Sequence, residues 1–220
     1  GRRVFENIPK YLQYAFYLLS ASSIFISGYL FSLRAKNWAR GKSEKRKTTL
    51  VSKIKNFFDG ILMRTVLRFR AAGVMHSMIY VGFLGLFAGT ITLEIHHLMP
   101  PSLKFLQGTT YFIYSFSLEV ASLIYLFGIA WALFRRIFGT EDRIKTKTKT
   151  DDYLTLGLLA FMGISGLTTE AGRIIVEGFP EYEKWSFVGY FIADVLPVEN
   201  GVLFHRISWI LHVISFFVFL

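Results

Sequence analysis

Residues 73–97, GVMHSMIYVGFLGLFAGTITLEIHH, decide the fold class of this chain. The apolar side chains form a run long enough to cross a hydrocarbon layer of about 30 Å as an α-helix. The stretch carries His76 near its start and His96 and His97 at its end. Polar side chains inside a lipid layer are costly and usually functional, so these histidines call for a functional explanation.

Four further apolar runs complete a pattern of membrane spans. With the quoted stretch they give five predicted spans, at residues 11–33, 71–98, 109–134, 153–176 and 201–220. Apolar residues make up 53% of the sequence, and it contains no Cys, which excludes disulfides, thiolate metal sites and cysteine-attached haem within these residues. The sequence therefore predicts an all-α integral membrane bundle of five transmembrane helices, forming a single domain over residues 1–220.

Basic residues are distributed unevenly over the two ends of the predicted helices. The net charge is +10, and of the 25 Lys and Arg, 12 lie in residues 34–70 and six in residues 135–152. The connections at the opposite ends hold only Lys104 and Lys184. Short basic loops stay in the cytoplasm, so both basic connections are predicted inside and the N-terminus outside. The charge is thus a topology signal that also suits anionic lipid or an acidic partner, and nucleic acid is not an expected partner.

Two connections and one helix face are predicted to be structural. Gly82, Gly85 and Gly89 line one side of the second span, where small residues let another helix approach closely. Residues 53–70 alternate basic and bulky apolar side chains at helical spacing, which predicts a helix lying along the inner membrane surface. Residues 177–200 form a longer outer connection that is predicted to cap the bundle.

The last span carries two more histidines, seven residues apart. At 100° per residue, His205 and His212 fall within about 20° of each other on one helix face and lie roughly 10 Å apart along the axis. Under the predicted topology, His97 and His205 lie at similar outer depth and His76 near the cytoplasmic boundary. Imidazoles from two facing helices are the usual means by which a helical bundle holds a b-type haem. Zinc is the competing metal, but no Asp or Cys joins these histidines at tight spacing.

Several charged side chains also fall within predicted spans. Glu119 lies in the third span and Glu94 in the second, and a carboxylate inside a bundle suits proton transfer to or from a bound quinone. Glu170 and Arg173 are three residues apart in the fourth span and can pair on one helix face. Arg173 and Arg206 are candidates to anchor haem propionates near the outer side.

Four stretches taken together resemble a known family of membrane cytochromes. The stretches are NIPKYLQYAFYLL, GVMHSMIYVGFLGLFAGT, LTTEAGRI and FHRISWILHVIS, and the histidines lie on the second and fifth of five spans. This pattern resembles the γ subunit of respiratory nitrate reductase. It is more similar to the membrane domain of heterodisulfide-reductase-related iron–sulfur oxidoreductases, which include the membrane-bound electron-transfer-flavoprotein:menaquinone oxidoreductases.

The resemblance implies cofactors and partners. It implies one or two b-type haems, with His76 and His212 as axial ligands and a further histidine from the last helix beyond Leu220. It also implies menaquinone or another quinone, iron–sulfur clusters in a cytoplasmic domain or subunit outside these residues, electron-transfer flavoprotein as a soluble partner, and a bacterial or archaeal cytoplasmic membrane. The nitrate reductase pattern has a second histidine ten residues after the first on span two. Leu86 stands there in this chain, which makes His97 the candidate for the second haem.

We therefore expect a quinone-linked oxidoreductase domain that moves electrons between the quinone pool and cytoplasmic iron–sulfur centres, with Glu119 or Glu94 exchanging protons. The ligands expected for the outer haem are His212 or His205 with His97. One alternative is a nitrate-reductase-like subunit that oxidises quinol. Another is a membrane anchor or transporter without a cofactor, which does not explain histidines confined to two spans.

Overall fold

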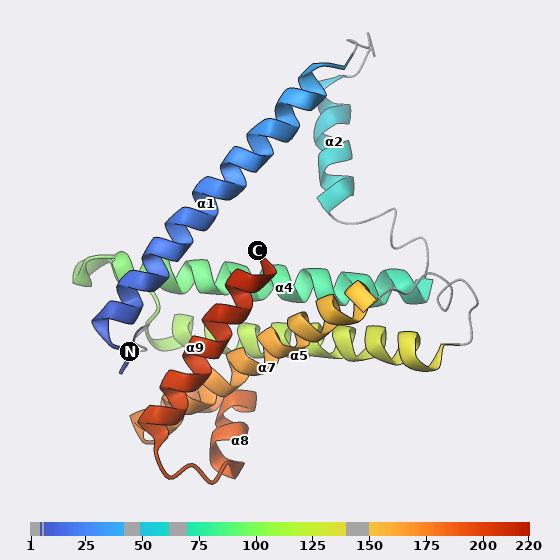
Figure 1. Cartoon of the computed structure of the whole chain (residues 1–220). Coiled ribbons are helices and arrows are strands. Elements are labelled where there is room, and N and C mark those ends of the chain that lie inside the picture. Colours follow the sequence, from blue (N-terminus) through green and yellow to red (C-terminus); the bar gives the residue numbers. More distant parts are fainter. Residues whose placement is uncertain (1–4, 6, 42–48, 62–69, 140–149) are drawn as a thin grey trace.

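The structure, a computed structural model, describes residues 5, 7–41, 49–61, 70–139 and 150–220 (Figure 1). The described residues form seven α-helices and two short 3₁₀-helices. In chain order these are α1 (Lys10–Ala39), α2 (Leu50–Ile61), α4 (Arg70–Leu98), η1 (Pro101–Leu103), α5 (Gly108–Phe138), α7 (Thr150–Glu177), η2 (Glu181–Trp185), α8 (Phe187–Val195) and α9 (Gly201–Phe219). The prediction of an all-α fold is confirmed for the described residues.

Five of these helices, α1, α4, α5, α7 and α9, are long and apolar enough to cross a membrane. They coincide with the five predicted spans and are compatible with a multi-pass membrane bundle. Most extend beyond the apolar runs. α1, for example, continues from Leu33 to Ala39. This extension passes through Arg34 and Lys36, and because Arg and Lys are good helix formers, a helix need not end where its apolar run ends. The orientation in the membrane stays a prediction.

The amphipathic helix expected along the inner surface is described only in part. The structure gives α2 over Leu50–Ile61, three residues earlier than the predicted start at residue 53. Residues 62–69 of that segment, and the basic residues 42–48 before it, lie outside the described residues.

α4 and α5 pack against each other through glycines. A Cβ atom added at Gly82 would lie 2.7 Å from the Cβ of Tyr125 and 2.9 Å from its Cα, and one at Gly128 would lie 3.0 Å from the backbone nitrogen of Ile79. Gly89 is similarly tight against Leu118. These distances leave no room for a side chain, so the two backbones lie in direct contact. The prediction that the glycine face of the second span serves helix packing is confirmed.

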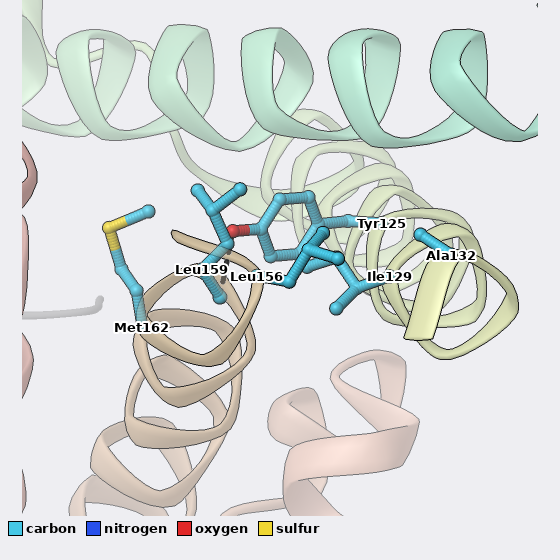
Figure 2. Close-up of a cluster of buried hydrophobic side chains, with 6 residues drawn as sticks. All are labelled: Tyr125, Ile129, Ala132, Leu156, Leu159 and Met162. Carbon is cyan, nitrogen blue, oxygen red and sulfur yellow. Dashed lines mark hydrogen bonds between the residues drawn. The ribbon is translucent and has the colours of Figure 1, made fainter. Parts of the chain in front are cut away.

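The main apolar core lies between α5 and α7 and is shown in Figure 2. Its buried side chains are Tyr125, Ile129, Ala132, Leu156, Leu159 and Met162. The Tyr125 hydroxyl donates a hydrogen bond of 2.8 Å to the Leu159 carbonyl oxygen, which satisfies the one polar atom that this cluster buries from α5. Phe83 of α4 and Phe216 of α9 pack on the same cluster, so four of the long helices share one core.

α1 leans away from these four helices along most of its length (Figure 1). None of its residues is buried. Its first half contacts the bundle through Phe16, whose ring centroid lies 6.1 Å from that of Trp209 and 6.1 Å from that of Phe217. Farther along, side chains such as Phe25 are exposed, which suits contact with lipid chains.

The connection between α7 and α9, predicted to lie outside, folds back over the ends of α5 and α7. Helix α7 stops at Gly178, whose φ of +76° is the left-handed conformation typical of a helix C-terminus. The Phe179 amide then donates a hydrogen bond to the Ile174 carbonyl oxygen. η2 and α8 follow at once, and α8 lies near α7 (Figure 1). Ala193 of α8 packs on Ala171 and Ile174 of α7. The predicted cap thus has its own helical structure.

The close contact between α4 and α5 predicts that Gly82→Ala destabilises the protein. The added methyl group meets the backbone of Tyr125, and overpacking of this kind costs about 1–3 kcal/mol. The measurement is thermal unfolding of the detergent-purified protein followed by circular dichroism.

Gly157→Ala is the matched control, because nothing lies within 4 Å of a Cβ atom at this position of α7. This variant should match or exceed the wild-type melting temperature, since Ala is favoured over Gly in a helix by about 1 kcal/mol. Equal melting temperatures for the two variants would contradict the α4–α5 contact described above.

Candidate functional site

Both histidines of α9 face α7. A Cβ atom placed on Gly172 would lie 2.9 Å from the Cα of His205, and one placed on Gly166 would lie 3.1 Å from Cε1 of His212. Ser208 and Ser215 are buried on the same side of α9. Small residues on both helices therefore allow the close approach that carries the two imidazoles into the bundle.

His212 is held by hydrogen bonds from its Nδ1 atom. Nδ1 lies 3.0 Å from the Met162 carbonyl oxygen and 3.1 Å from the Ser165 hydroxyl oxygen. The carbonyl oxygen can only accept, so Nδ1 is the protonated nitrogen when this bond forms, and the neutral ring carries its lone pair on Nε2. A histidine that binds a metal through Nε2 has this arrangement, with the other nitrogen donating to a carbonyl group.

The histidines of α4 lie in different environments. His76 is exposed, on the helix face that also carries Phe83 and Phe87. His96 is buried, and its Nδ1 accepts a hydrogen bond of 3.1 Å from the Leu106 amide. His97 is exposed, and its ring lies edge-on to Phe5 at 5.6 Å between centroids. The bond to Leu106 gives His96 a structural role at the end of α4.

The sequence predicted that histidines of the second and fifth spans project toward each other, and here the structure differs. α4 and α9 meet through aromatic rings, with 5.7 Å between the centroids of Phe83 and Phe219 and 6.3 Å between those of Phe87 and Phe216. At the outer end the ring of Phe5 contacts both His97 and Trp209 of α9. The physical reason is the close packing of α7 and α9 at small residues, with Gly166 and Gly172 of α7 directly opposite the histidines. This packing turns the histidine face of α9 toward α7. The ligand roles of His76, His97, His205 and His212 stay predictions.

Glu94 lies near the C-terminal end of α4, within reach of α1. It accepts a hydrogen bond of 2.5 Å from the Tyr17 hydroxyl. This contact ties the first half of α1 to the bundle beside the cluster of Phe5, Phe16 and His97. Its role in proton exchange stays a prediction.

Glu119 is deeply buried, with 2% of the residue exposed. Its two carboxyl oxygens accept hydrogen bonds of 3.3 Å from the backbone N–H groups of Val188 and Gly189, at the N-terminus of α8. The carboxyl group of Glu170, from α7, reaches the same point, because a Cβ atom added at Gly189 would lie 3.0 Å from its Oε2 atom. Gly189 is needed here, because a Cβ atom would lie 2.8 Å from Cγ of Glu170. Sequence analysis selected Glu119 but gave no sign that α8 would reach it.

Arg173 is buried among carboxylates rather than held in a simple pair. Its guanidinium group contacts both oxygens of Glu183, at 2.8 and 2.9 Å, and Glu177 at 3.0 Å. The predicted contact with Glu170 is present at 3.8 Å and is the longest of the set. Glu183, which is fully buried, also accepts a hydrogen bond of 2.6 Å from the Tyr111 hydroxyl. One residue of the connection between α7 and α9 thus joins α5 to α7.

The main partner of Arg173 was missed by sequence analysis. Glu183 lies in GFPEYEKW, which holds two acidic side chains and directly follows Glu177, and this offered only a weak signal. Arg206, the other predicted propionate anchor, donates from Nε to the Asn7 carbonyl oxygen at 2.7 Å. A contact with a propionate stays a prediction for both arginines.

Tyr182 adds a hydroxyl group to the loop side of this cluster. It donates a hydrogen bond of 3.2 Å to Glu177. Burial, followed by the nearby carboxylates of Glu177 and Glu183, raises the pKa of Tyr182, while Arg173 acts in the opposite direction. The hydroxyl therefore stays protonated and remains a hydrogen-bond donor as the pH rises past neutral.

Across the described ranges, no group of three or more His, Cys, Asp or Glu side chains is arranged to hold a metal ion. A b-type haem differs from a zinc site in needing only one or two axial side chains. The arrangement is that of a helical, membrane-compatible bundle with a fixed imidazole and a buried carboxyl cluster at one end.

The comparisons with known proteins relate the chain to oxidoreductases. It is 26% identical over 235 residues to EtfAB:quinone oxidoreductase of Syntrophomonas wolfei, a match that covers 100% of this chain and 32% of that protein. It is 24% identical over 213 residues to the probable iron-sulfur-binding oxidoreductase FadF of Bacillus subtilis, covering 93% of this chain and 29% of that protein. The chain thus spans about a third of the length of these curated relatives.

No family model and no solved structure matches the chain. Both relatives are named as oxidoreductases.

The buried contact between Arg173 and Glu183 predicts that Glu183→Gln is strongly destabilising. The amide removes the charge that is bonded to both guanidinium nitrogens and leaves Arg173 with Glu177 at 3.0 Å and Glu170 at 3.8 Å, and losing a buried hydrogen bond to a charged group costs about 1.5–3 kcal/mol. Thermal unfolding of the purified protein measures the loss.

Glu181→Gln is the control from the same 3₁₀-helix. The side chain of Glu181 is 92% exposed and pairs with Lys184 at 3.3 Å, and exposed pairs contribute about 0–1 kcal/mol. A Glu183→Gln variant as stable as this control would show that the cluster does not hold the outer end together.

Proposed function

We propose that this chain is the membrane domain of a quinone-linked oxidoreductase. It passes electrons between a pool of menaquinone or another quinone and iron–sulfur centres. These centres lie in a cytoplasmic domain or subunit outside these residues. Three findings support the proposal: five helices compatible with membrane crossing, histidines within two of them, and relatives whose names specify a quinone oxidoreductase and an iron-sulfur-binding oxidoreductase.

The observation that carries the proposal is the fixed imidazole of His212. Its Nδ1 is bound to Met162 and Ser165, and no hydrogen bond to its Nε2 is found among the described residues. In a helix that only packs against its neighbour, an apolar side chain would fill this position at lower cost. The described residues therefore fit a b-type haem at this point, with His212 as one axial ligand.

A haem held there supplies one-electron redox chemistry, while the protein supplies position and surroundings. His212 fixes the outer position, and His205 and His97 remain the other candidates near the outer surface. His76 is proposed to bind a second haem near the cytoplasmic side, with its partner ligand outside these 220 residues. Phe83 and Phe87, on the same face of α4, offer apolar surface beside that position.

The partner proteins follow from the same proposal. Electron-transfer flavoprotein is the proposed soluble donor or acceptor, because one relative carries EtfAB in its name. The basic connections would face the cytoplasm under the predicted topology and would suit docking of an acidic iron–sulfur domain. A flavoprotein-linked dehydrogenase reduces the quinone, whereas a nitrate-reductase-like arrangement oxidises the quinol.

The test of haem binding is the visible spectrum of the purified full-length protein. We expect a reduced-minus-oxidised difference spectrum of a b-type cytochrome, with one or two haems per chain by pyridine-haemochrome assay. His212→Ala and His76→Ala should each remove one equivalent, because each loses an axial ligand.

His96→Asn is the matched control, since Asn can still accept the hydrogen bond from the Leu106 amide. It should retain full haem content. A colourless protein after expression with sufficient haem would overturn the haem proposal, and full haem content in both ligand variants would overturn the choice of ligands.

A further inference from the structure

The space between α5, α7 and α8 brings together more acidic groups than basic ones. The titratable and charged side chains that face it are Glu119 and Tyr111 of α5, Glu170, Arg173 and Glu177 of α7, and Tyr182 and Glu183 of η2, with His205 of α9 opposite Gly172. Arg173 pairs with Glu183 at 2.8 Å, with Glu177 at 3.0 Å and with Glu170 at 3.8 Å. One positive charge thus serves three carboxylates before the buried carboxyl group of Glu119 is added.

A shared proton explains how Glu119 and Glu170 lie together. Both carboxyl groups reach Gly189 of α8: its N–H group donates to Glu119, and a Cβ atom added there would lie 3.0 Å from Oε2 of Glu170. Two ionised carboxylates so close together in a buried place repel each other, which favours a proton on one of them. The remaining negative charge is stabilised by the N-terminus of α8, because the N–H groups of Val188 and Gly189 donate to the carboxyl oxygens of Glu119. The site thus holds one proton and one charge.

Ser115 supplies a second, independent observation. It is 1% exposed, and its hydroxyl oxygen has no hydrogen-bond partner in the structure. It lies on the buried face of α5 between Tyr111, which binds Glu183, and Glu119, which binds α8. The Nε atom of Arg173, from the facing helix, is likewise buried without a partner. Buried polar atoms left over in this way are usually bridged by ordered water.

We propose that Glu119 and Glu170 form a proton-exchange site, and that water bound at Ser115 connects it to Tyr111, Glu183 and the outer surface. Along the axis of α5, Ser115 lies about 6 Å and Tyr111 about 12 Å from Glu119 toward the start of the helix. A proton leaves one carboxyl oxygen as its O–H bond breaks, and a new O–H bond forms on the water. No electron moves in this step. The use of this proton in quinone chemistry rests on the proposed function, whereas the shared proton and its path do not.

Infrared difference spectroscopy of the full-length protein tests the shared proton without any quinone. We expect the carbonyl-stretch band of a protonated, buried carboxyl group at neutral pH, shifted on exchange into D₂O. Glu119→Gln and Glu170→Gln should each abolish it, because the amide that replaces one carboxyl group donates to the other and leaves that group ionised. Glu181→Gln, at an exposed site, should retain the band. A band that survives in both buried variants, or that is absent from the wild type, overturns the proposal.

Turnover with a soluble naphthoquinone tests the link to the reaction. Glu119→Gln should lower the rate by about 10²-fold, the lower end of the range for a positioned proton-transfer group. Ser115→Ala should slow turnover and shift its pH profile with little change in melting temperature, because the hydroxyl group bonds to no other protein atom in the structure. Ser117→Ala is the control, since Ser117 is exposed on the same helix and bonds only within it.

The infrared and turnover measurements distinguish the proposed proton-exchange site from the proposed quinone-linked function. If the wild type contains haem but Glu119→Gln turns over at the normal rate, the role of the site in quinone chemistry is overturned and the proposed function stands. If the wild type shows no quinone-dependent turnover, the proposed function fails, and the infrared result alone decides whether the proton site exists.

Discussion

The bidentate contact between Arg173 and Glu183 organises one end of the molecule. A buried guanidinium group is tolerated only when it is paired and hydrogen-bonded, and the best-placed carboxylate comes from η2, in the connection after α7, rather than from a neighbouring long helix. Satisfying Arg173 therefore draws η2 into the bundle, and Tyr111 fixes the same carboxylate to α5. α8 begins directly after η2, which brings its N-terminus onto Glu119. A single charge requirement thus positions the loop, the short helix and the buried carboxyl pair.

The histidines of α9 follow from a different constraint, the close approach of two helices. α7 and α9 can approach closely because glycines lie opposite His205 and His212. The imidazole of His212 consequently reaches a carbonyl oxygen of α7, and its orientation is set by that bond. In lipid the hydrophobic effect does little to drive helices together, because the lipid chains are as apolar as the side chains. Close packing at small residues therefore decides which helix faces meet. The aromatic face of α9 is left to meet α4.

Much of the fold could be predicted from local pattern. Apolar runs gave the five long helices, and the spacing of Gly82, Gly85 and Gly89 correctly indicated a packing face. The three-residue separation of Glu170 and Arg173 correctly indicated a contact, because neighbours on one helix are fixed by its geometry. Glu183 and the N-terminus of α8 could not be found in this way. Their contacts join residues that are 10 and 70 positions apart and depend on how a loop folds.

The sequence by itself determined which segments are helical, where the histidines lie along each helix, and that charged residues had to be accommodated among apolar ones. These properties depend on helix periodicity and on the length of apolar runs, both of which are local. Only the tertiary structure decided that the histidine face of α9 lies against α7, that Arg173 is paired mainly with a loop residue, and that Glu119 meets Glu170. These outcomes depend on which helix surfaces fit together most closely, and that fit is a property of pairs of helices rather than of any one stretch of sequence.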